Sequence, residues 1–226
     1  MVSYLKRAVM VMLTTKSETR TEQMDQAAEG VACSAEKLAI ATGLWINGNV
    51  YGRFEARESL LYEEKLTLKI SEENPHSKIA LLNYFICNHG NEEKRIMLLA
   101  MHLPKTFVMN HFSFISPADQ TIFHLAGEKM FLVGGLPEEN LKWKATVIPS
   151  WHISSDSIWG DVGRGVLKYS PLAKGNPASI LSADIAVPPG KTVRLSSWII
   201  SGEGKTEVVR LRDVLLKNRL AFQNEK

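Results

Sequence analysis

The stretch "GRGVLKYSPLAKGNPASILSADIAVPPGKTVRLSSWIISGEGKTE", residues 163–207, decides the fold. Two apolar runs flank a Pro-Pro-Gly turn, and the second run ends in a Gly-Glu-Gly break before a pattern typical of a helix. Proline and glycine mark such turns because proline fixes φ and glycine tolerates positive φ. The stretch therefore predicts two successive β-strands followed by a C-terminal helix.

The preceding part of the chain repeats this pattern of short apolar runs separated by turns. Asn47-Gly48 lies between two β-prone runs, which predicts a hairpin with a type I′ turn, and a second hairpin is expected to turn at Gly127. In residues 78–103, "KIALLNYFICNHGNEEKRIMLLAMHL", two nearly continuous apolar runs indicate strands that are covered on both faces. About ten to twelve such strands favour an all-β fold, a large antiparallel β-sandwich (a supersandwich) with a C-terminal helix.

This interpretation divides the chain into an N-terminal segment of uncertain structure (1–35), the β-supersandwich (36–205), and a C-terminal helix and tail (206–226). Four apolar residues recur at helical spacing in the last part: Val208, Leu211, Val214 and Leu215. We expect this stripe to fold back on the sandwich, or to bind a second copy or a protein partner. The basic residues of the helix are expected to stay in water: Arg210, Arg212, Lys217 and Arg219.

Composition argues against several classes of protein. The net charge is only +3, and basic residues alternate with acidic ones, so we expect no nucleic-acid-binding surface. No segment approaches the ~20 apolar residues of a membrane span, and the apolar run at residues 8–13 is short for a secretory signal. Cys33 and Cys87 are expected to be free thiols, which predicts a cytoplasmic protein.

The six histidines do not follow the spacing of metal ligands. His102, His111 and His124 lie in separate predicted strands and could converge in space, although hydrogen-bonded histidines inside a sandwich are the more common arrangement. The sequence also offers no convincing pair of carboxylates for glycoside hydrolysis. We therefore expect no metal site and no cofactor.

The loop "PSWHISSDSIWGDVGRG", residues 149–165, is the strongest candidate for a binding site. It combines aromatic and acidic residues: Trp151, His152, Asp156, Trp159 and Asp161. An aromatic ring can cover the apolar C–H face of a sugar while a carboxylate accepts hydrogen bonds from its hydroxyls. The alternative is that the tryptophans fold back and cover an end of the sandwich. The residue pattern alone leaves both interpretations open.

The final strands resemble the end of the N-terminal β-supersandwich domain of bacterial glucoamylase-like enzymes, glycoside hydrolase family 15. The resemblance rests on a Gly-x-Leu strand, a Pro-Leu-Ala-x-Gly turn, a Pro-Gly turn and a closing Trp-Ile-x-x-Gly pattern. Here these are residues 165–167, 171–175, 189–190 and 198–202. The stretches "NYFICNHGNEEKRIMLLAMH" and "ADQTIFHLAGEKMFLVGG" are similar to two further parts of that domain, so the resemblance extends over about residues 65–220.

The resemblance implies a non-catalytic, carbohydrate-associated β-sandwich protein whose partner is an oligo- or polysaccharide. In the family the catalytic carboxylates belong to a following (α/α)6 barrel, and this chain stops at Lys226, so no catalytic residue has a matching position here. We accordingly expect no hydrolysis of α-glucans. The alternatives are a protein-interaction module, or the remnant of a longer enzyme, in either case without affinity for sugar.

Overall fold

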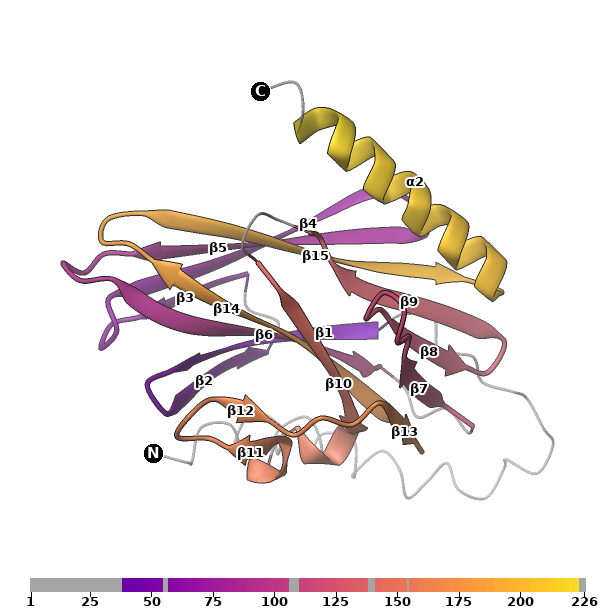
Figure 1. Ribbon diagram of the computed structural model, residues 1–226, viewed down its shortest axis with the longest axis horizontal. Coiled ribbons are helices and arrows are strands. Elements are labelled where there is room, and N and C mark those ends of the chain that lie inside the picture. Colours follow the sequence, from indigo (N-terminus) through magenta and orange to yellow (C-terminus); the bar gives the residue numbers. More distant parts are fainter. Residues whose placement is uncertain (1–37, 55–56, 106–109, 138–140, 154, 224–226) are drawn as a thin grey trace, which may run out of the picture.

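Two antiparallel sheets form the protein in the computed structural model, which describes residues 38–54, 57–105, 110–137, 141–153 and 155–223 (Figure 1). The five-stranded sheet contains, in spatial order, β10 (Trp143–Pro149), β14 (Pro177–Val187), β6 (Lys94–Pro104), β1 (Leu38–Ile46) and β2 (Asn49–Phe54). The eight-stranded sheet contains β13 (Leu172–Lys174), β7 (Phe112–Ile115), β8 (Ile122–Ala126), β9 (Lys129–Gly135), β15 (Thr192–Gly202), β5 (Ile79–Asn88), β4 (Leu66–His76) and β3 (Glu58–Leu61). The predicted all-β sandwich is confirmed.

Three smaller elements and one long helix complete the described chain. Two short 3-10 helices, η1 (Ser150–His152) and η2 (Asp156–Ile158), precede a two-stranded hairpin of β11 (Trp159–Asp161) and β12 (Val166–Leu167). The helix α2 (Lys205–Gln223) follows β15. In Figure 1 the helix lies along the outside of the eight-stranded sheet, and the β11–β12 hairpin lies on the opposite side of the molecule.

Both hairpins expected from the sequence are present. Ile46 pairs with Asn49, and the two turn residues Asn47 and Gly48 have φ of 48° and 87°, as a type I′ turn requires. In the second hairpin Ala126 pairs with Lys129, and Gly127 has a φ of 65°. The turn residues therefore set the register of β1 with β2 and of β8 with β9.

Two other turns carry the chain from one sheet to the other. Strand β5 belongs to the eight-stranded sheet and β6 to the five-stranded one, while β14 and β15 are divided in the opposite order. The fully buried Asn88 joins these two turns. Its side-chain amide donates to the main-chain oxygens of Val187 (2.9 Å) and Glu92 (2.7 Å), and its Oδ1 accepts from the main-chain N–H of Gly90 (2.9 Å).

Both sheets are covered on their inner faces and over part of their outer faces, as the nearly continuous apolar runs of β5 and β6 predicted. In β6, Leu98 and Ala100 face the core between the sheets, whereas Leu99 and Met101 pack under the segment that contains η1, η2 and β11. Helix α2 covers the outer face of the eight-stranded sheet around β9 and β15. The sandwich therefore has three apolar layers, and the segment at residues 150–167 closes one of them.

Helix α2 folds back on the sandwich, one of the outcomes expected for its apolar stripe. Val208 and Leu215 are buried against β15 and its neighbours, Leu211 is half-buried, and Val214 is 49% exposed. Arg212 corrects an expectation, because its side chain is only 17% exposed and forms ion pairs with Asp119 and Asp213. The turn between β7 and β8 supplies Asp119 and so brings an acidic partner to this arginine.

No helix in the described part of the chain is long and apolar enough to cross a membrane. Cys87 is a half-buried free thiol. Cys33 and the N-terminal segment 1–35 lie outside the described residues, so the predicted domain boundary there and the cytoplasmic location stay predictions.

We predict that Leu215→Ala lowers the free energy of unfolding by roughly 2–3 kcal/mol, because a buried leucine is truncated and a cavity is left beside the sheet. Val214→Ala, one position earlier on the same helix but half exposed, should change it by less than about 0.5 kcal/mol. Urea denaturation of both variants measures the difference. Equal unfolding midpoints for the two variants would show that the helix does not stabilise the sandwich.

Candidate functional site

The segment after β10 is positioned by its apolar residues. Ile153, Ile158 and Trp159 are buried against the outer face of the five-stranded sheet. Short-range hydrogen bonds shape the backbone between them, from the N–H of Ile153 to the oxygen of Ser150 (3.2 Å) and from the N–H of Ser155 to the oxygen of His152 (3.0 Å). The segment is thus a cover for the sheet, and the side chains that do not take part in this packing project outward.

The two tryptophans of the predicted site have opposite environments. Trp159 is 6% exposed and belongs to the apolar layer under the segment, whereas Trp151 in η1 is 61% exposed. The ring of Trp151 meets that of His152 edge to face, with 5.9 Å between the centroids. The alternative interpretation, folding back to cover the sandwich, therefore holds for Trp159, and Trp151 alone offers its ring to a ligand.

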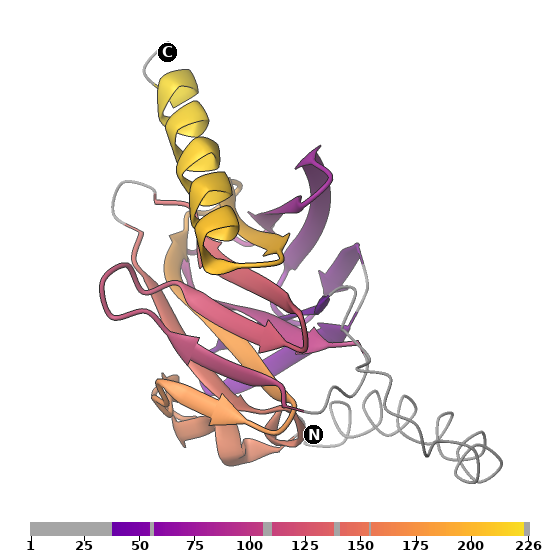
Figure 2. The same cartoon turned by 90° about the vertical axis from the view of Figure 1, so that its right-hand side faces the viewer.

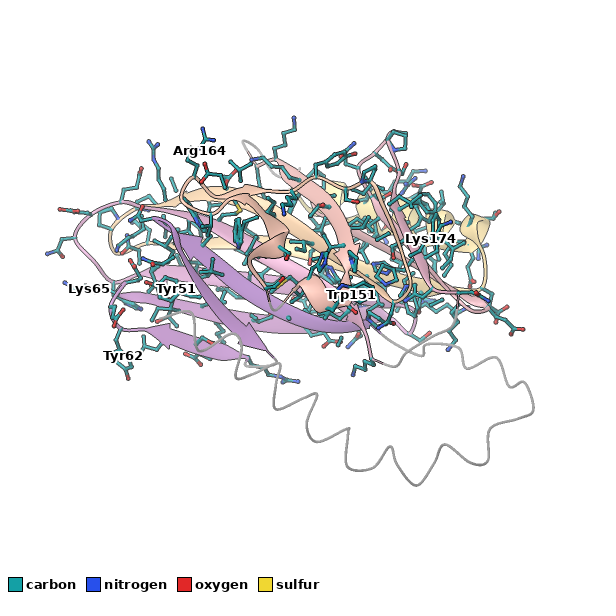
Figure 3. The ribbon with its side chains drawn as sticks, turned by 90° about the horizontal axis from the view of Figure 1, so that it is seen from below. Tyr51, Tyr62, Lys65, Trp151, Arg164 and Lys174 are labelled. Carbon is teal, nitrogen blue, oxygen red and sulfur yellow. The ribbon has the colours of Figure 1, made fainter. Side chains whose placement is uncertain are left out.

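The structure does not bring Asp161 to Trp151. Asp161 pairs with Arg164 (2.6 Å), and this guanidinium holds the pKa of the Asp161 carboxyl below its ordinary value. Figure 3 shows Arg164 at a distance from Trp151, on another part of the surface. The side chain of Asp156 lies outside what the structure describes. Trp151 and His152 are thus the two predicted site residues that the structure places side by side.

A second cluster forms inside the sandwich, where His102, His111 and His124 do converge. Nδ1 of His124 lies 2.6 Å from Oγ of Ser113 and 3.1 Å from Nε2 of His111. Nε2 of His124 lies 2.9 Å from Oγ of Ser179, which is 3.4 Å from Nδ1 of His102. This buried histidine cluster connects β6 and β14 of one sheet with β7 and β8 of the other.

The buried histidine cluster is electrically neutral near pH 7. Burial lowers the pKa of His102 to about 3 and that of His111 to about 4, the latter against an opposing effect of the nearby Asn176 side chain. Burial, followed by the proximity of the other two histidines, also lowers the pKa of His124 well below its ordinary value. Nε2 of His102 has no hydrogen-bond partner, so the cluster ends in an unsatisfied polar atom.

The buried histidine cluster does not form a metal centre. Within the described residues no group of three or more His, Cys, Asp or Glu side chains is arranged to hold a metal ion. All three rings and both serines are at most 1% exposed, so substrate has no direct access to them. Sequence reasoning missed Ser113 and Ser179; each pairs across a strand with a histidine, His124 and His102 respectively, and only the strand register reveals this.

Comparisons with known proteins give similarity at the level of structure only. No family model and no curated protein sequence matches this chain. Its similar solved structures include a polysaccharide lyase, which has 10% sequence identity and a TM-score of 0.41 over 76% of this chain and 26% of that one. They also include a bacterial glucoamylase complexed with acarbose, which has 7% sequence identity and a TM-score of 0.43 over 83% of this chain and 30% of that one. A chain assigned as a kojibiose phosphorylase from the human microbiome has 9% sequence identity and a TM-score of 0.31 over 79% of this chain and 24% of that one.

The chain therefore spans between 24% and 30% of the length of these three structures. Membership of glycoside hydrolase family 15 stays a prediction.

The buried histidine cluster predicts a loss of stability in mild acid. Each histidine accepts a proton near pH 6.5 in the unfolded chain, but His111 and His102 do so only near pH 4 and 3 in the folded one. The unfolded state thus binds more protons over this window, and stability falls as the pH decreases from about 6.5. We predict that His102→Asn reduces the slope of unfolding free energy against pH by about 1.4 kcal/mol per pH unit near pH 5.

The matched control for this measurement is His76→Gln, because His76 is exposed at the end of β4. Urea denaturation at several pH values between 4.5 and 7.5 gives the slopes. Since the readout is the slope, a constant loss of stability in His102→Asn does not disturb it. A slope identical to that of the parent protein would contradict the prediction.

Proposed function

We propose that this chain is a non-catalytic β-sandwich protein that binds an oligo- or polysaccharide, comparable to the accessory N-terminal domain of glucoamylase-like enzymes. The observation that carries the proposal is the exposed ring of Trp151, held on η1 beside His152. An exposed tryptophan is costly to leave in water and is suited to the apolar face of a pyranose ring. The neighbouring imidazole and main-chain groups supply hydrogen bonds to sugar hydroxyls.

The proposal keeps the predicted site in a reduced form. Trp151 and His152 form its centre, and Asp161 contributes to a more distant part of the surface. Trp159 acts through the fold, since its ring anchors the segment that presents Trp151. A flat site built around one ring suits a chain end or a single face of a polysaccharide.

A protein-interaction module is the second candidate, and one observation favours it. Val214 is half exposed on α2, next to a shallow groove of about 630 Å³ that Val209, Arg210 and Lys217 help to line. Val208 and Leu215, however, already cover the sheet, so only part of the predicted stripe faces outward. The apolar area that remains for a protein partner is small, and the carbohydrate proposal is preferred.

We predict that Trp151→Ala weakens glycan binding roughly thirtyfold or more, the effect of losing about 2 kcal/mol at a tryptophan anchor. A glycan array identifies the bound saccharide, and titration calorimetry with that saccharide measures the affinity of parent and variant. The melting temperature should stay unchanged, because the removed ring is mostly exposed.

The matched control for this measurement is Tyr62→Ala. Tyr62 is an 81% exposed aromatic residue that Figure 3 shows away from Trp151. The Tyr62→Ala variant should bind glycan with the affinity of the parent protein. Absence of any bound glycan, or equal affinities for parent and Trp151→Ala, would reject the proposal.

A further inference from the structure

Exposed apolar side chains gather on the segment that covers the five-stranded sheet. Among the described residues eight large hydrophobic side chains are exposed, and four of them lie between β10 and β13: Trp151, Val162, Val166 and Tyr169. Tyr169 is the most exposed of the four, at 67%. Figure 2 shows this segment, in salmon and orange, on the opposite side of the molecule from helix α2. Exposed apolar residues that gather on one face mark a binding surface, whereas scattered ones need no explanation.

The chain around Tyr169 is fixed to β10 by hydrogen bonds on both sides of this residue. Oγ1 of the buried Thr146 donates to the main-chain oxygen of Lys168 (2.8 Å) and accepts from the N–H of Ser170 (3.0 Å). The N–H of Val147 donates to the main-chain oxygen of Ser170 (3.0 Å). Tyr169 therefore lies at the crest of a short arch over Thr146, with its side chain in water.

Tyr169 and Trp151 belong to the same covering layer. The N–H of Lys168 donates to the main-chain oxygen of Ile158 (2.9 Å), which joins the arch to η2. Ile158 is buried against the outer face of the five-stranded sheet, and Leu167, just before the arch, is half-buried there. The exposed rings of Trp151 and Tyr169 therefore lie on the side of this layer that faces the solvent.

The two rings occupy successive positions along an extended surface. The arch meets β10 at Val147, and Trp151 follows four residues later, in η1. A strand advances about 3.3 Å per residue and a 3-10 helix about 2 Å, so on the order of 10 Å separates the two points at which the chain carries these rings. A ligand that meets both rings must extend over about this distance.

The surface next to Tyr169 is shallow. Gly160 in β11 has no side chain, and a Cβ at this position would lie 3.7 Å from Cγ1 of Val166 and 3.9 Å from Cγ of Lys168. These two side chains therefore lie on the same outward face of the β11–β12 hairpin as Gly160. An extended ligand can pass Tyr169 on this face without meeting a bulky side chain at Gly160.

We infer that Tyr169 is a second aromatic contact of the glycan site, and that this site binds one face of an extended polysaccharide chain. The chain runs from Trp151 over the covering segment to Tyr169, and each ring covers the apolar C–H face of a different sugar residue. His152 and Lys168 donate hydrogen bonds to the hydroxyls beside these rings. This inference rests on the proposed function, and it selects the face of a polysaccharide over a chain end.

Affinity electrophoresis of the full chain tests the inference, in gels that contain soluble starch, mixed-linkage β-glucan, xylan, galactomannan or pectin. At least one of these polymers should retard the parent protein. Oligosaccharides of two to six sugar residues, cut from that polymer, then serve as ligands in titration calorimetry. The affinity should rise about tenfold or more from the disaccharide to the hexasaccharide, because the longer ligand reaches the second ring once the first is bound.

Tyr169→Ala should weaken binding of the hexasaccharide about tenfold and leave binding of the disaccharide unchanged, so the dependence on chain length disappears. Tyr169→Phe keeps the flat ring and should bind both ligands with the affinity of the parent. Trp151→Ala should weaken the binding of both. The melting temperature of Tyr169→Ala should equal that of the parent protein, because the removed ring is mostly exposed.

Equal affinities of parent and Tyr169→Ala for the hexasaccharide would overturn the inference and leave binding at Trp151 intact. A protein that binds a short glycan on an array, but is retarded by none of the polymers, would overturn it in the same way. Absence of any bound glycan would remove the proposed function as well. A gel that contains gelatin is the matched control, and retardation there that depends on Tyr169 would replace the polysaccharide by an extended peptide.

Discussion

Asn88 is the residue on which the arrangement of the two sheets depends. A buried asparagine offers two side-chain donors, one side-chain acceptor and its main-chain groups, and here every one of these groups has a hydrogen-bond partner. Its main-chain N–H donates to the oxygen of Lys191 (3.0 Å), and its own oxygen accepts from the N–H of Gly190 (2.9 Å). An unsatisfied buried polar group costs about 1–3 kcal/mol, so these bonds favour a single arrangement of the two turns. The two turns thereby place β6 in the five-stranded sheet and β15 in the eight-stranded sheet.

The sequence predicts the strands and their covered faces better than it predicts their partners. Alternation along β4 and the apolar run of β6 follow from local periodicity, and the Asn47-Gly48 turn defines its own hairpin. The assignment of β5 and β6 to different sheets does not follow from local periodicity. A polar turn can connect two paired strands of a hairpin, and it can equally well connect two strands of different sheets. The deciding contact joins Asn88 to Val187, 99 positions later, and no local pattern encodes such a pair.

The candidate site shows the same limit at the level of single side chains. The sequence places two tryptophans in one loop, but their exposure depends on the elements that hold them. Trp159 begins strand β11 and packs on the sheet, whereas η1, which carries Trp151, has no buried residue. The convergence of three histidines was foreseeable as a possibility from the strands that carry them. The serine partners of these histidines were not foreseeable, since serine in a strand carries no signal of its own. The register of β6 with β14 determines that Ser179 meets His102.

The core between the sheets changes from aliphatic to partly polar along its length. Near Asn88 it is aliphatic, with Leu66, Ile86 and Val187 packed together. Farther along it contains the buried histidine cluster and Thr42, and both His102 and Thr42 carry a polar atom without a partner. These two lie on neighbouring strands, because Ile40 pairs with His102 and Thr42 with Ala100.

Apolar residues of similar shape in these positions would keep the fold and could stabilise it, since burying unsatisfied polar groups is unfavourable. Stability therefore does not account for their presence. Among the described residues of this core, the half that contains His102 and Thr42 therefore carries a desolvation cost that the aliphatic residues near Asn88 do not.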